Sequence, residues 1–273
     1  MSKQLTSILL VNYNGAIFLK DCIDSIHKSF QGLLYEIVLL DNASHDNSLQ
    51  IIEAGFPEVI LIKNPENLGF SKGNNIAFHK AKGNNILLLN TDTILLSPMQ
   101  EVVDFLENNP QTGVIGIKMV DKNGNYRKSA GHFPSPLRLL QLKRLYLSQN
   151  GFADGNFEKQ TKALKADWIE GSFLLTNRSN WEQVGGLDED YFMYIEDMDF
   201  CKKVSLLNKN NVYLPNFQYI HYGGFNHSKE HLLRAGLIRY SNKFFSGITK
   251  KFAIIAVKLN HALKKKYAKK TTS

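Results

Sequence analysis

Residues 7–15 read Ser-Ile-Leu-Leu-Val-Asn-Tyr-Asn-Gly, a short apolar run that ends in polar residues. A run of this length bounded by Asn and Gly is typical of a buried β-strand followed by a loop. Residues 35–44 repeat the arrangement, with Tyr-Glu-Ile-Val-Leu-Leu followed by Asp-Asn-Ala-Ser. Because residues 16–29 between them have helical periodicity, the sequence predicts a β-α-β unit with parallel strands.

The same alternation continues through the first half of the chain. It predicts strands at residues 7–12, 35–40, 58–63, 85–90 and 113–119, and helices at residues 16–29, 46–55, 71–82 and 98–108. Ser44 or Asp46 is available to cap the second helix, and Ser97 precedes Pro98 at the start of the fourth. We therefore expect an α/β fold with a mainly parallel central sheet flanked by helices.

Polar residues follow three of the predicted strands. Asn12, Tyr13 and Asn14 follow the first, Asp41 follows the second, and Asp92 follows the run that ends at residue 90. Ligands of such sheets bind outside the carboxyl ends of the strands. Asp92 could hold a divalent ion together with substrate phosphates, or it could cap the following turn.

Carboxylates crowd residues 188–199, interleaved with aromatic and Met side chains that favour burial. At helical spacing, Glu196 and Asp199 share a face while Asp197 points elsewhere. One carboxylate can then face a cavity as another binds a cation. The alternative is an acidic first turn that the helix dipole favours.

The basic character of the chain belongs to its last segment. The net charge is +8, but residues 228–273 carry +11, which leaves −3 for residues 1–227. Apolar residues recur there at helical spacing: Leu233, Leu237, Tyr240, Phe244, Ile248, Phe252, Ile255, Leu259 and Leu263. Two amphipathic basic helices are predicted. For residues 248–270 we favour binding to an anionic membrane surface over docking on the rest of the protein; for residues 233–244 both remain open.

Several classes of protein lack their characteristic motif in this sequence. There is no GxGxxG of a dinucleotide oxidoreductase after the first strand, no GxxxxGK[ST] of a P-loop NTPase, no HExxH of a zincin and no GxSxG of an α/β-hydrolase. Its basic residues lack the interleaved aromatic platform of a single-strand binder, so we expect no nucleic-acid partner. Cys22 and Cys201 form no metal-ligand spacing, and neither end carries a signal peptide or an apolar run long enough to span a bilayer. These features predict a reduced, cytoplasmic compartment, with peripheral association at the inner face of the plasma membrane.

A series of short motifs carries a resemblance to a known family. These are residues 7–15, 41–48, 64–70, 73–75, 89–93, 171–173 and 185–189, the last leading into 196–199. Each is weak alone, but all of them in this order are highly specific. Over about residues 5–225 the chain resembles the family 2, GT-A-fold, inverting glycosyltransferases, especially the bacterial rhamnosyltransferase-like branch.

The resemblance implies an organisation and a reaction. Residues 1–227 would form the GT-A catalytic domain, with a nucleotide-binding half at about 1–120, an acceptor-binding half at about 121–227, and residues 228–273 as appended basic helices. A sugar would pass from dTDP-rhamnose or a UDP-hexose to a hydroxyl of a glycan or a polyprenyl-linked saccharide, in cell-surface polysaccharide synthesis. The alternative is a relative that binds a nucleotide sugar without transferring it.

The resemblance also implies residues for the donor. Asp41 would accept the N3–H of uracil or thymine, with Tyr13 near the base. Asp92 and His221 would hold Mg²⁺ or Mn²⁺ against the diphosphate, although Asn90 replaces the first aspartate of the DxD-type motif and His221 could equally be structural. Further nucleotide contacts are implied for Asn12, Asn14, Asn67, Gly69, Asn74, Thr91 and Asp92.

On the acceptor side, the resemblance implies one catalytic base. Inversion requires a single displacement in which a carboxylate takes the proton of the attacking hydroxyl. Asp197 matches the family's base, and Glu196 is the competing candidate. Acceptor-side roles are implied for Trp168, Glu170, Gly171 and Asp199.

Overall fold

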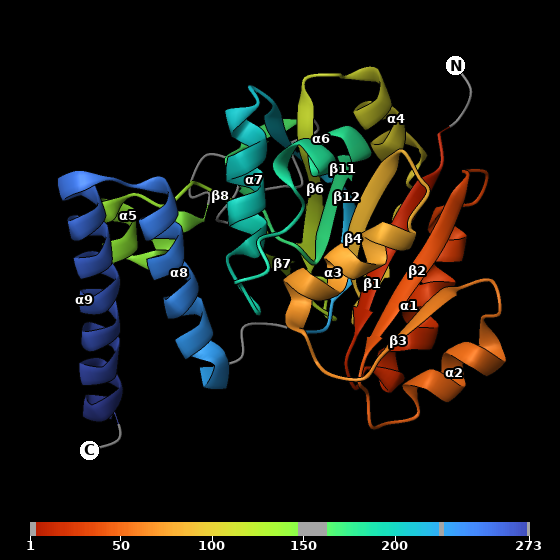
Figure 1. The fold of residues 1–273 in the computed structure, drawn as a ribbon, viewed down its shortest axis with the longest axis horizontal. Coiled ribbons are helices and arrows are strands. Elements are labelled where there is room, and N and C mark those ends of the chain that lie inside the picture. The colour runs from red at the N-terminus through yellow and green to blue at the C-terminus, as the bar shows by residue number, and fades with distance from the viewer. Residues whose placement is uncertain (1–3, 147–162, 224–226, 272–273) are drawn as a thin grey trace.

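The chain folds as helices on both faces of one large sheet, with a pair of helices at one side (Figure 1). The computed structural model describes residues 4–146, 163–223 and 227–271. Its N-terminal half forms the parallel part of the sheet, in the order β3-β2-β1-β4. These strands are β1 (Thr6–Asn12), β2 (Tyr35–Asn42), β3 (Ile60–Asn64) and β4 (Asn85–Asn90). The predicted β-α-β arrangement is confirmed.

The other half of the sheet mixes directions. β11 (Phe173–Asn177) lies antiparallel between β4 and β6 (Thr112–Val120), and β12 (Asn210–His221) runs parallel to β6. β5 (Thr93–Leu95) pairs antiparallel with the end of β12. Two short strands complete this half, β7 (Tyr126–Arg127) beside β6 and β9 (Leu164–Ala166) beside β12. β8 (Ala130–Gly131) and β10 (Trp168–Ile169) pair with each other in a separate two-stranded sheet. The large sheet is mixed and mostly parallel.

Two apolar clusters, one on each face, hold the helices to the sheet. Successive strand side chains point to opposite faces, so Leu9 joins one cluster while Ile8 and Leu10 join the other. One face carries α1 (Ala16–Ser29), α2 (Ser48–Gly55) and α4 (Gln100–Asn108). The other carries α3 (Gly69–Lys80), α6 (Arg178–Val184) and α7 (Glu196–Leu206).

Two predicted helix starts are wrong. α2 begins at Ser48 after Asn47, because the Asp46 carboxylate instead accepts hydrogen bonds from the Ala16 amide and from Ser48. α4 begins at Gln100, because the Ser97 hydroxyl accepts from the Gln218 amide in β12. Ser97 Oγ and Asp46 Oδ2 thus bind tertiary partners, while Asp46 Oδ1 binds Ser48, the first residue of α2.

Residues 168–177 form two strands joined by a short turn. β10 and β11 are separate strands, and residues 170–172 form a turn between them. His221 is the last residue of β12. The turn and the end of β12 bring polar side chains to the same end of the sheet.

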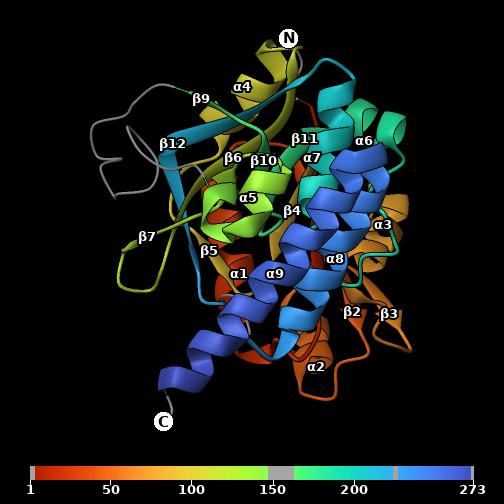
Figure 2. The same cartoon turned by 90° about the vertical axis from the view of Figure 1, so that its left-hand side faces the viewer.

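The basic C-terminal segment forms α8 (Glu230–Phe244) and α9 (Gly247–Thr271), which lie beside α5 (Pro136–Leu140) (Figure 2). Leu237 and Tyr240 of α8, and Ala253 and Val257 of α9, are buried in the core cluster. One face of each helix is thus docked on the rest of the protein. No helix in the described ranges is long and apolar enough to cross a membrane.

Candidate active site

The ends of β1 and β2 form a polar edge, because their register sets Asn12 opposite Asp41. The side-chain amide of Asn12 donates to Asp41 Oδ2 at 2.8 Å and to Ser44 Oγ at 3.0 Å. Asp41 Oδ1 accepts from the backbone amide of Ser44 at 2.9 Å. Each Asp41 oxygen keeps a second lone pair. The Tyr13 ring beside this edge is 49% exposed, and Asn14 Oδ1 accepts from the His45 amide.

The other residues predicted to contact the nucleotide lie around the same edge. They differ in their exposure and in the hydrogen bonds that already occupy their side chains. Asn67 Oδ1 accepts from the Gly69 amide at the start of α3, and from the Asn42 side chain. Asn74 is buried, and its amide donates to the Phe70 carbonyl within α3. Thr91 is 9% exposed, so only a small part of it faces outward. Asn67 thus orders the backbone at the start of α3.

Asp92 and His221 meet because β12 pairs with β5. The register sets His221 opposite Thr93, next in sequence to Asp92. His221 Nε2 lies 3.3 Å from Asp92 Oδ1 and 3.3 Å from the Asn90 amide. The structure thus brings together the two predicted metal ligands, which lie far apart in the sequence.

The two side chains stabilise each other's charged forms. Burial alone would raise the pKa of Asp92, but the hydrogen bond and charge of His221 outweigh it and lower this pKa. Burial alone would lower the pKa of His221, but Asp92 and then Glu170 outweigh it and raise this pKa. The pair forms a polarised site with one carboxylate and one imidazole.

The space beside this pair fits a divalent ion, because the neighbouring residue has no side chain. A Cβ at Gly223 would lie 2.2 Å from Asp92 Oδ2 and 3.1 Å from His221 Nε2, so the residue next to the pair must lack a side chain. Carboxylate oxygen and imidazole nitrogen both ligate Mn²⁺, and Mg²⁺ accepts one or two carboxylates with substrate phosphates. No cluster of three or more His, Cys, Asp or Glu suited to a metal occurs in the described ranges. An ion held by this pair would therefore need substrate oxygens to complete its shell.

The turn at residues 170–172 lies between this pair and the acidic helix start. Glu170 Oε1 is 3.8 Å from His221 Nδ1, and the Gly171 amide donates to Asp197 Oδ2 at 2.9 Å. Burial raises the pKa of Glu170 to about 7, and the charge of Asp197 adds to the rise. One short turn thus joins the predicted metal pair to the predicted base.

Asp197 and Glu196, at the first turn of α7, are in different surroundings. Asp197 is half-buried and accepts from the amides of Gly171 and Met198; burial raises its pKa to about 6. Glu196 is 5% exposed, and its buried Oε2 has no hydrogen-bond partner within the described part of the chain. Burial and then the charge of Asp197 raise the pKa of Glu196 well above its usual range.

Two predicted acceptor-side residues lie in the interior. Trp168 is 4% exposed, and its indole N–H donates to the Leu145 carbonyl at 3.1 Å. Asp199 is fully buried beneath the Tyr191 hydroxyl. These two residues can influence an acceptor only through the residues that they support.

Sequence reasoning missed several residues at the site. Arg127 donates to the Gly223 carbonyl at 2.9 Å, beside the metal pair. Arg239 and Lys243 of α8 form ion pairs with the acidic segment before α7. The spacing of four residues between these two cations was the available signal, because it places them on one helix face.

Comparisons with known proteins agree with the fold and the motifs. A model described as "Glycosyl transferase family 2" matches residues 7–166. N-acetylglucosaminyl-diphospho-decaprenol L-rhamnosyltransferase of Mycobacterium tuberculosis is 26% identical in a 203-residue alignment that covers 68% of this chain and 66% of that protein. Rhamnosyltransferase WbbL of Escherichia coli K12 is 24% identical over 233 residues, covering 79% of this chain and 82% of that one.

A solved structure supports the fold. The mannosyltransferase PcManGT from Pyrobaculum calidifontis, in complex with GDP-Man and Mn²⁺, superposes with a TM-score of 0.61 at 13% identity, over 96% of this chain and 75% of that one. The sheet order and flanking helices are those of the GT-A fold. Because the family match spans more than half of its residues, the chain belongs to glycosyl transferase family 2, in the branch that resembles the rhamnosyltransferases.

Proposed function

We propose that this protein is an inverting glycosyltransferase that moves a sugar from a nucleotide-diphosphate donor to a hydroxyl of a glycan or a polyprenyl-linked saccharide. One observation carries the proposal: the turn at residues 170–172 contacts the Asp92–His221 pair on one side and Asp197 on the other. The reaction needs a diphosphate site and a base within reach of one anomeric carbon. dTDP-rhamnose and a UDP-hexose are the proposed donors, supported by the rhamnosyltransferase relatives.

At the donor end, the uracil or thymine ring of the nucleotide lies at the edge formed by the ends of β1 and β2. Asp41 accepts the N3–H of uracil or thymine through a free lone pair, and Tyr13 packs against the ring. Asp92 and His221 would hold Mg²⁺ or Mn²⁺, which when bound would supply positive charge beside the departing diphosphate. Mn²⁺ in the structurally similar mannosyltransferase supports this use of a divalent cation.

At the acceptor end, Asp197 takes the proton of the attacking hydroxyl. Its pKa of about 6 keeps it ionised at neutral pH yet basic enough to accept a proton. Glu196 is the weaker candidate, because burial and the charge of Asp197 raise its pKa, which disfavours the ionised form that a base needs, and its side chain is buried. Glu170 would orient His221 from the far side of the imidazole ring.

We also propose that α9 binds the surface of an anionic membrane on the cytoplasmic side, where a polyprenyl-linked acceptor would be met. A stripe of exposed apolar side chains runs along this helix: Ile248 (71% exposed), Phe252 (57%), Ile255 (50%), Leu259 (48%) and Leu263 (52%). Exposed Lys251 and Lys258 flank the stripe at helical spacing. An apolar stripe flanked by cations suits the boundary between lipid headgroups and acyl chains.

The decisive experiment is a donor panel with Mg²⁺ or Mn²⁺, scored for nucleotide release with and without a saccharide acceptor. We expect acceptor-dependent release from one dTDP- or UDP-sugar. Asp197→Asn should abolish transfer while nucleotide binding, measured by calorimetry, survives. Lys28→Met, an exposed substitution on α1, is the control. Full transfer by Asp197→Asn would refute Asp197 as the catalytic base. Donor binding without release under any condition would favour the alternative, a non-catalytic relative.

A further inference from the structure

The segment between α6 and α7, residues 187–195, sets the position of the proposed base. It ends in Tyr194 and Ile195, two consecutive non-glycine residues with left-handed φ values of 71° and 75°. Such conformations cost free energy and persist only where the surroundings hold them. Ile195 is the N-cap of α7, and Asp197 is the second residue of that helix. Whatever holds this segment therefore also orients Asp197.

On one side, α3 holds the segment. Asn75 exchanges two hydrogen bonds with the backbone of Leu187, at 2.9 and 3.0 Å. The Phe70 amide donates to the Phe192 carbonyl at 2.8 Å. These contacts join the segment to the nucleotide-binding half.

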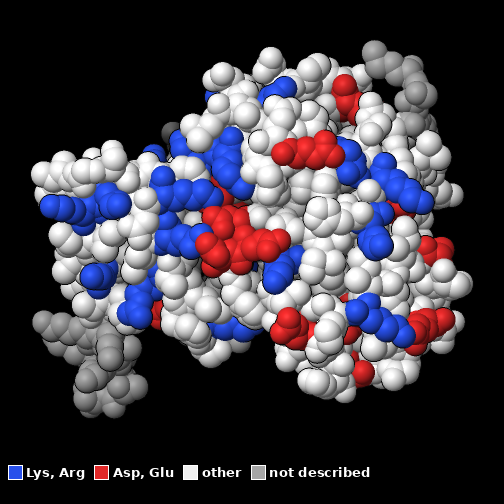
Figure 3. All heavy atoms as spheres, viewed as in Figure 1, with Lys and Arg blue, Asp and Glu red and all other residues white. Residues whose placement is uncertain are grey.

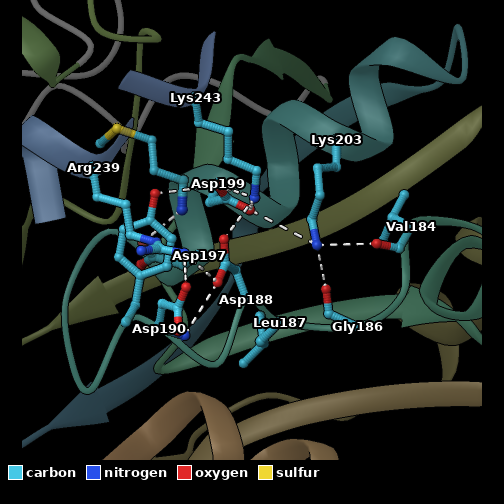
Figure 4. A network of polar contacts seen from close by, with 12 residues as sticks. Val184, Gly186, Leu187, Asp188, Asp190, Asp197, Asp199, Lys203, Arg239 and Lys243 are labelled. Atoms are coloured by element: carbon cyan, nitrogen blue, oxygen red, sulfur yellow. Dashed lines mark hydrogen bonds and ion pairs between the residues drawn. The ribbon is translucent and has the colours of Figure 1, made fainter. Parts of the chain in front are cut away.

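On the other side, α8 holds it through two cations (Figure 4). Lys243 Nζ lies 2.8 Å from Asp188 and 2.8 Å from Asp199, bridging the segment to the first turn of α7. Arg239 pairs with Asp188 at 3.3 Å and also with Asp190. In the space-filling view, acidic groups lie beside basic ones where the tail helices meet the domain (Figure 3).

The Lys243–Asp199 pair differs from an ordinary surface ion pair. Asp199 is 0% exposed, and Lys203, the other cation near it, is 3.8 Å away and donates to the carbonyls of Val184 and Gly186. A buried carboxylate without a close cation is strongly disfavoured. The Asp199 amide, in turn, donates to the Ile195 carbonyl at 2.8 Å. The charge on α8 thus stabilises the helix turn that carries Asp197.

α8 also packs directly on the strained residues. A Cβ at Gly236 would lie 3.0 Å from the Tyr194 carbonyl oxygen and 3.0 Å from Ile195 Cγ1. The helix therefore approaches the segment as closely as a residue without a side chain allows. Leu237, next to it, is buried in the core cluster.

We propose that α8 is a positioning element for catalysis: Lys243, Arg239 and Gly236 hold residues 187–195 against α3, and thereby keep the Asp197 carboxylate beside the Gly171 amide. This inference rests on the proposed role of Asp197. It makes the basic tail part of the active site's support, in addition to its proposed contact with lipid. The same helix pair then links the membrane-facing stripe on α9 to the catalytic carboxylate.

Charge substitutions on α8 test the proposal in a soluble assay without vesicles. We expect Lys243→Met to lower kcat by about tenfold or more, since small misplacements of a catalytic group have effects of this size, with the donor KM within about twofold. Lys243→Arg should recover most of the loss. Arg234→Met is the matched control, because Arg234 lines the groove between α8 and α9 and its loss removes the same charge from the same helix.

A packing substitution tests the same contact without changing charge. Gly236→Ala should lower kcat with little change in donor KM, because the added Cβ would lie 3.0 Å from the Tyr194 carbonyl oxygen and 3.0 Å from Ile195 Cγ1, contacts tight enough to push residues 194–195 by a few tenths of an ångström. Gly55→Ala is its control, since a Cβ there meets nothing within 4 Å. Equal kcat for wild type, Lys243→Met and Gly236→Ala would overturn the proposal, as would equal losses in Lys243→Met and Arg234→Met.

Amide hydrogen exchange separates a failure of this inference from a failure of the proposed function. Lys243→Met should speed exchange in residues 191–199 while residues 100–108 of α4 keep their protection. If the wild type transfers no sugar, the proposed function fails, and amide hydrogen exchange alone tests whether Lys243 holds the segment. Unchanged exchange in residues 191–199 of Lys243→Met would then refute this structural role of Lys243. Faster exchange with an unaltered kcat would refute the catalytic role of the contact.

Discussion

The Asp92–His221 pair, the proposed metal site, consists of one carboxylate and one imidazole. Asn90 stands where a stricter motif has a second carboxylate, and its amide lies 3.3 Å from His221 Nε2 instead. Asp92 and His221 therefore carry the proposed ion with the help of the donor's phosphates. The lack of a side chain at Gly223 keeps the space beside both ligands open.

Gly223→Ala should weaken metal-dependent donor binding. The new Cβ would overlap Asp92 Oδ2 and displace the carboxylate from its position. We expect the donor dissociation constant in Mn²⁺ to rise about tenfold, which corresponds to about 1.4 kcal/mol. Calorimetry with and without EDTA measures it, with Gly55→Ala as the control. Equal Mn²⁺-dependent affinity in both variants would contradict this role for Gly223.

The pKa of Asp197 predicts how the rate depends on pH. The base must be ionised to accept a proton, and burial raises its pKa to about 6. Going down in pH, the rate should therefore fall below about pH 6, approaching tenfold per pH unit as the ionised fraction drops. A profile of kcat from pH 5 to 8 at saturating donor measures it. A rate that stays constant from pH 5 to 7 would contradict Asp197 as the base.

At the scale of elements, strand register and helix faces decide what meets. The pairing of β12 with β5 brings His221 to Asp92, and the antiparallel insertion of β11 places the turn at residues 170–172 beside both. α9 has two faces: Ala253, Ala256 and Val257 are buried, while the stripe that includes Phe252 and Leu259 is exposed. The helix is thus docked on the protein and still has apolar surface for a second contact.

Phe252→Ser combined with Leu259→Ser should weaken binding to vesicles that contain anionic lipid. Burying each of these side chains contributes about 1.5–3 kcal/mol when it is complete, so we expect a loss of about tenfold or more. Sedimentation with vesicles measures it. Leu206→Ser is the control, because Leu206 is 63% exposed on α7, outside the tail.

Salt adds a second readout to the vesicle experiment. Raising ionic strength should weaken binding through the lysines and leave the apolar contribution, because screening acts on exposed charges. If a protein lacking residues 246–273 still sedimented with anionic vesicles at low salt, the membrane role of α9 would be refuted.

At the scale of the whole molecule, the donor edge and the acceptor side belong to one sheet. The parallel strands supply Asn12, Asp41 and Asp92, and the mixed half supplies His221 and the turn that contacts Asp197. Donor and metal should therefore stabilise the whole fold.

Donor nucleotide with Mn²⁺ should raise the melting temperature of the protein. Ligand at 100 times its dissociation constant adds about 2.7 kcal/mol of stability, which corresponds to about 5–10 °C in a domain of this size. Asp92→Asn should lose the Mn²⁺-dependent part of the shift and keep the part due to nucleotide alone. Thermal denaturation of both proteins measures it; an equal Mn²⁺ effect in the two would argue against Asp92 as a ligand.

The sequence by itself determined the elements and the chemistry at their ends. Strand and helix periodicity are local, so residues 7–12 and 16–29 were predicted closely, and Asp41 and Asp92 were found as the polar residues after buried runs. The motif order was sufficient to indicate the family. The helix starts at Ser48 and Gln100 were missed, because one Asp46 oxygen and the Ser97 hydroxyl accept hydrogen bonds from residues distant in the sequence.

Only the tertiary structure decided which side chains meet. The sequence named His221 as a candidate through a resemblance, but its contact with Asp92 depends on the register of two strands from opposite ends of the domain. The contact of Lys243 with Asp199 depends on the docking of α8, which the charge pattern could not separate from membrane binding. Local periodicity encodes where an element begins and which face is apolar; the partner of that face is set by packing of residues distant in the sequence.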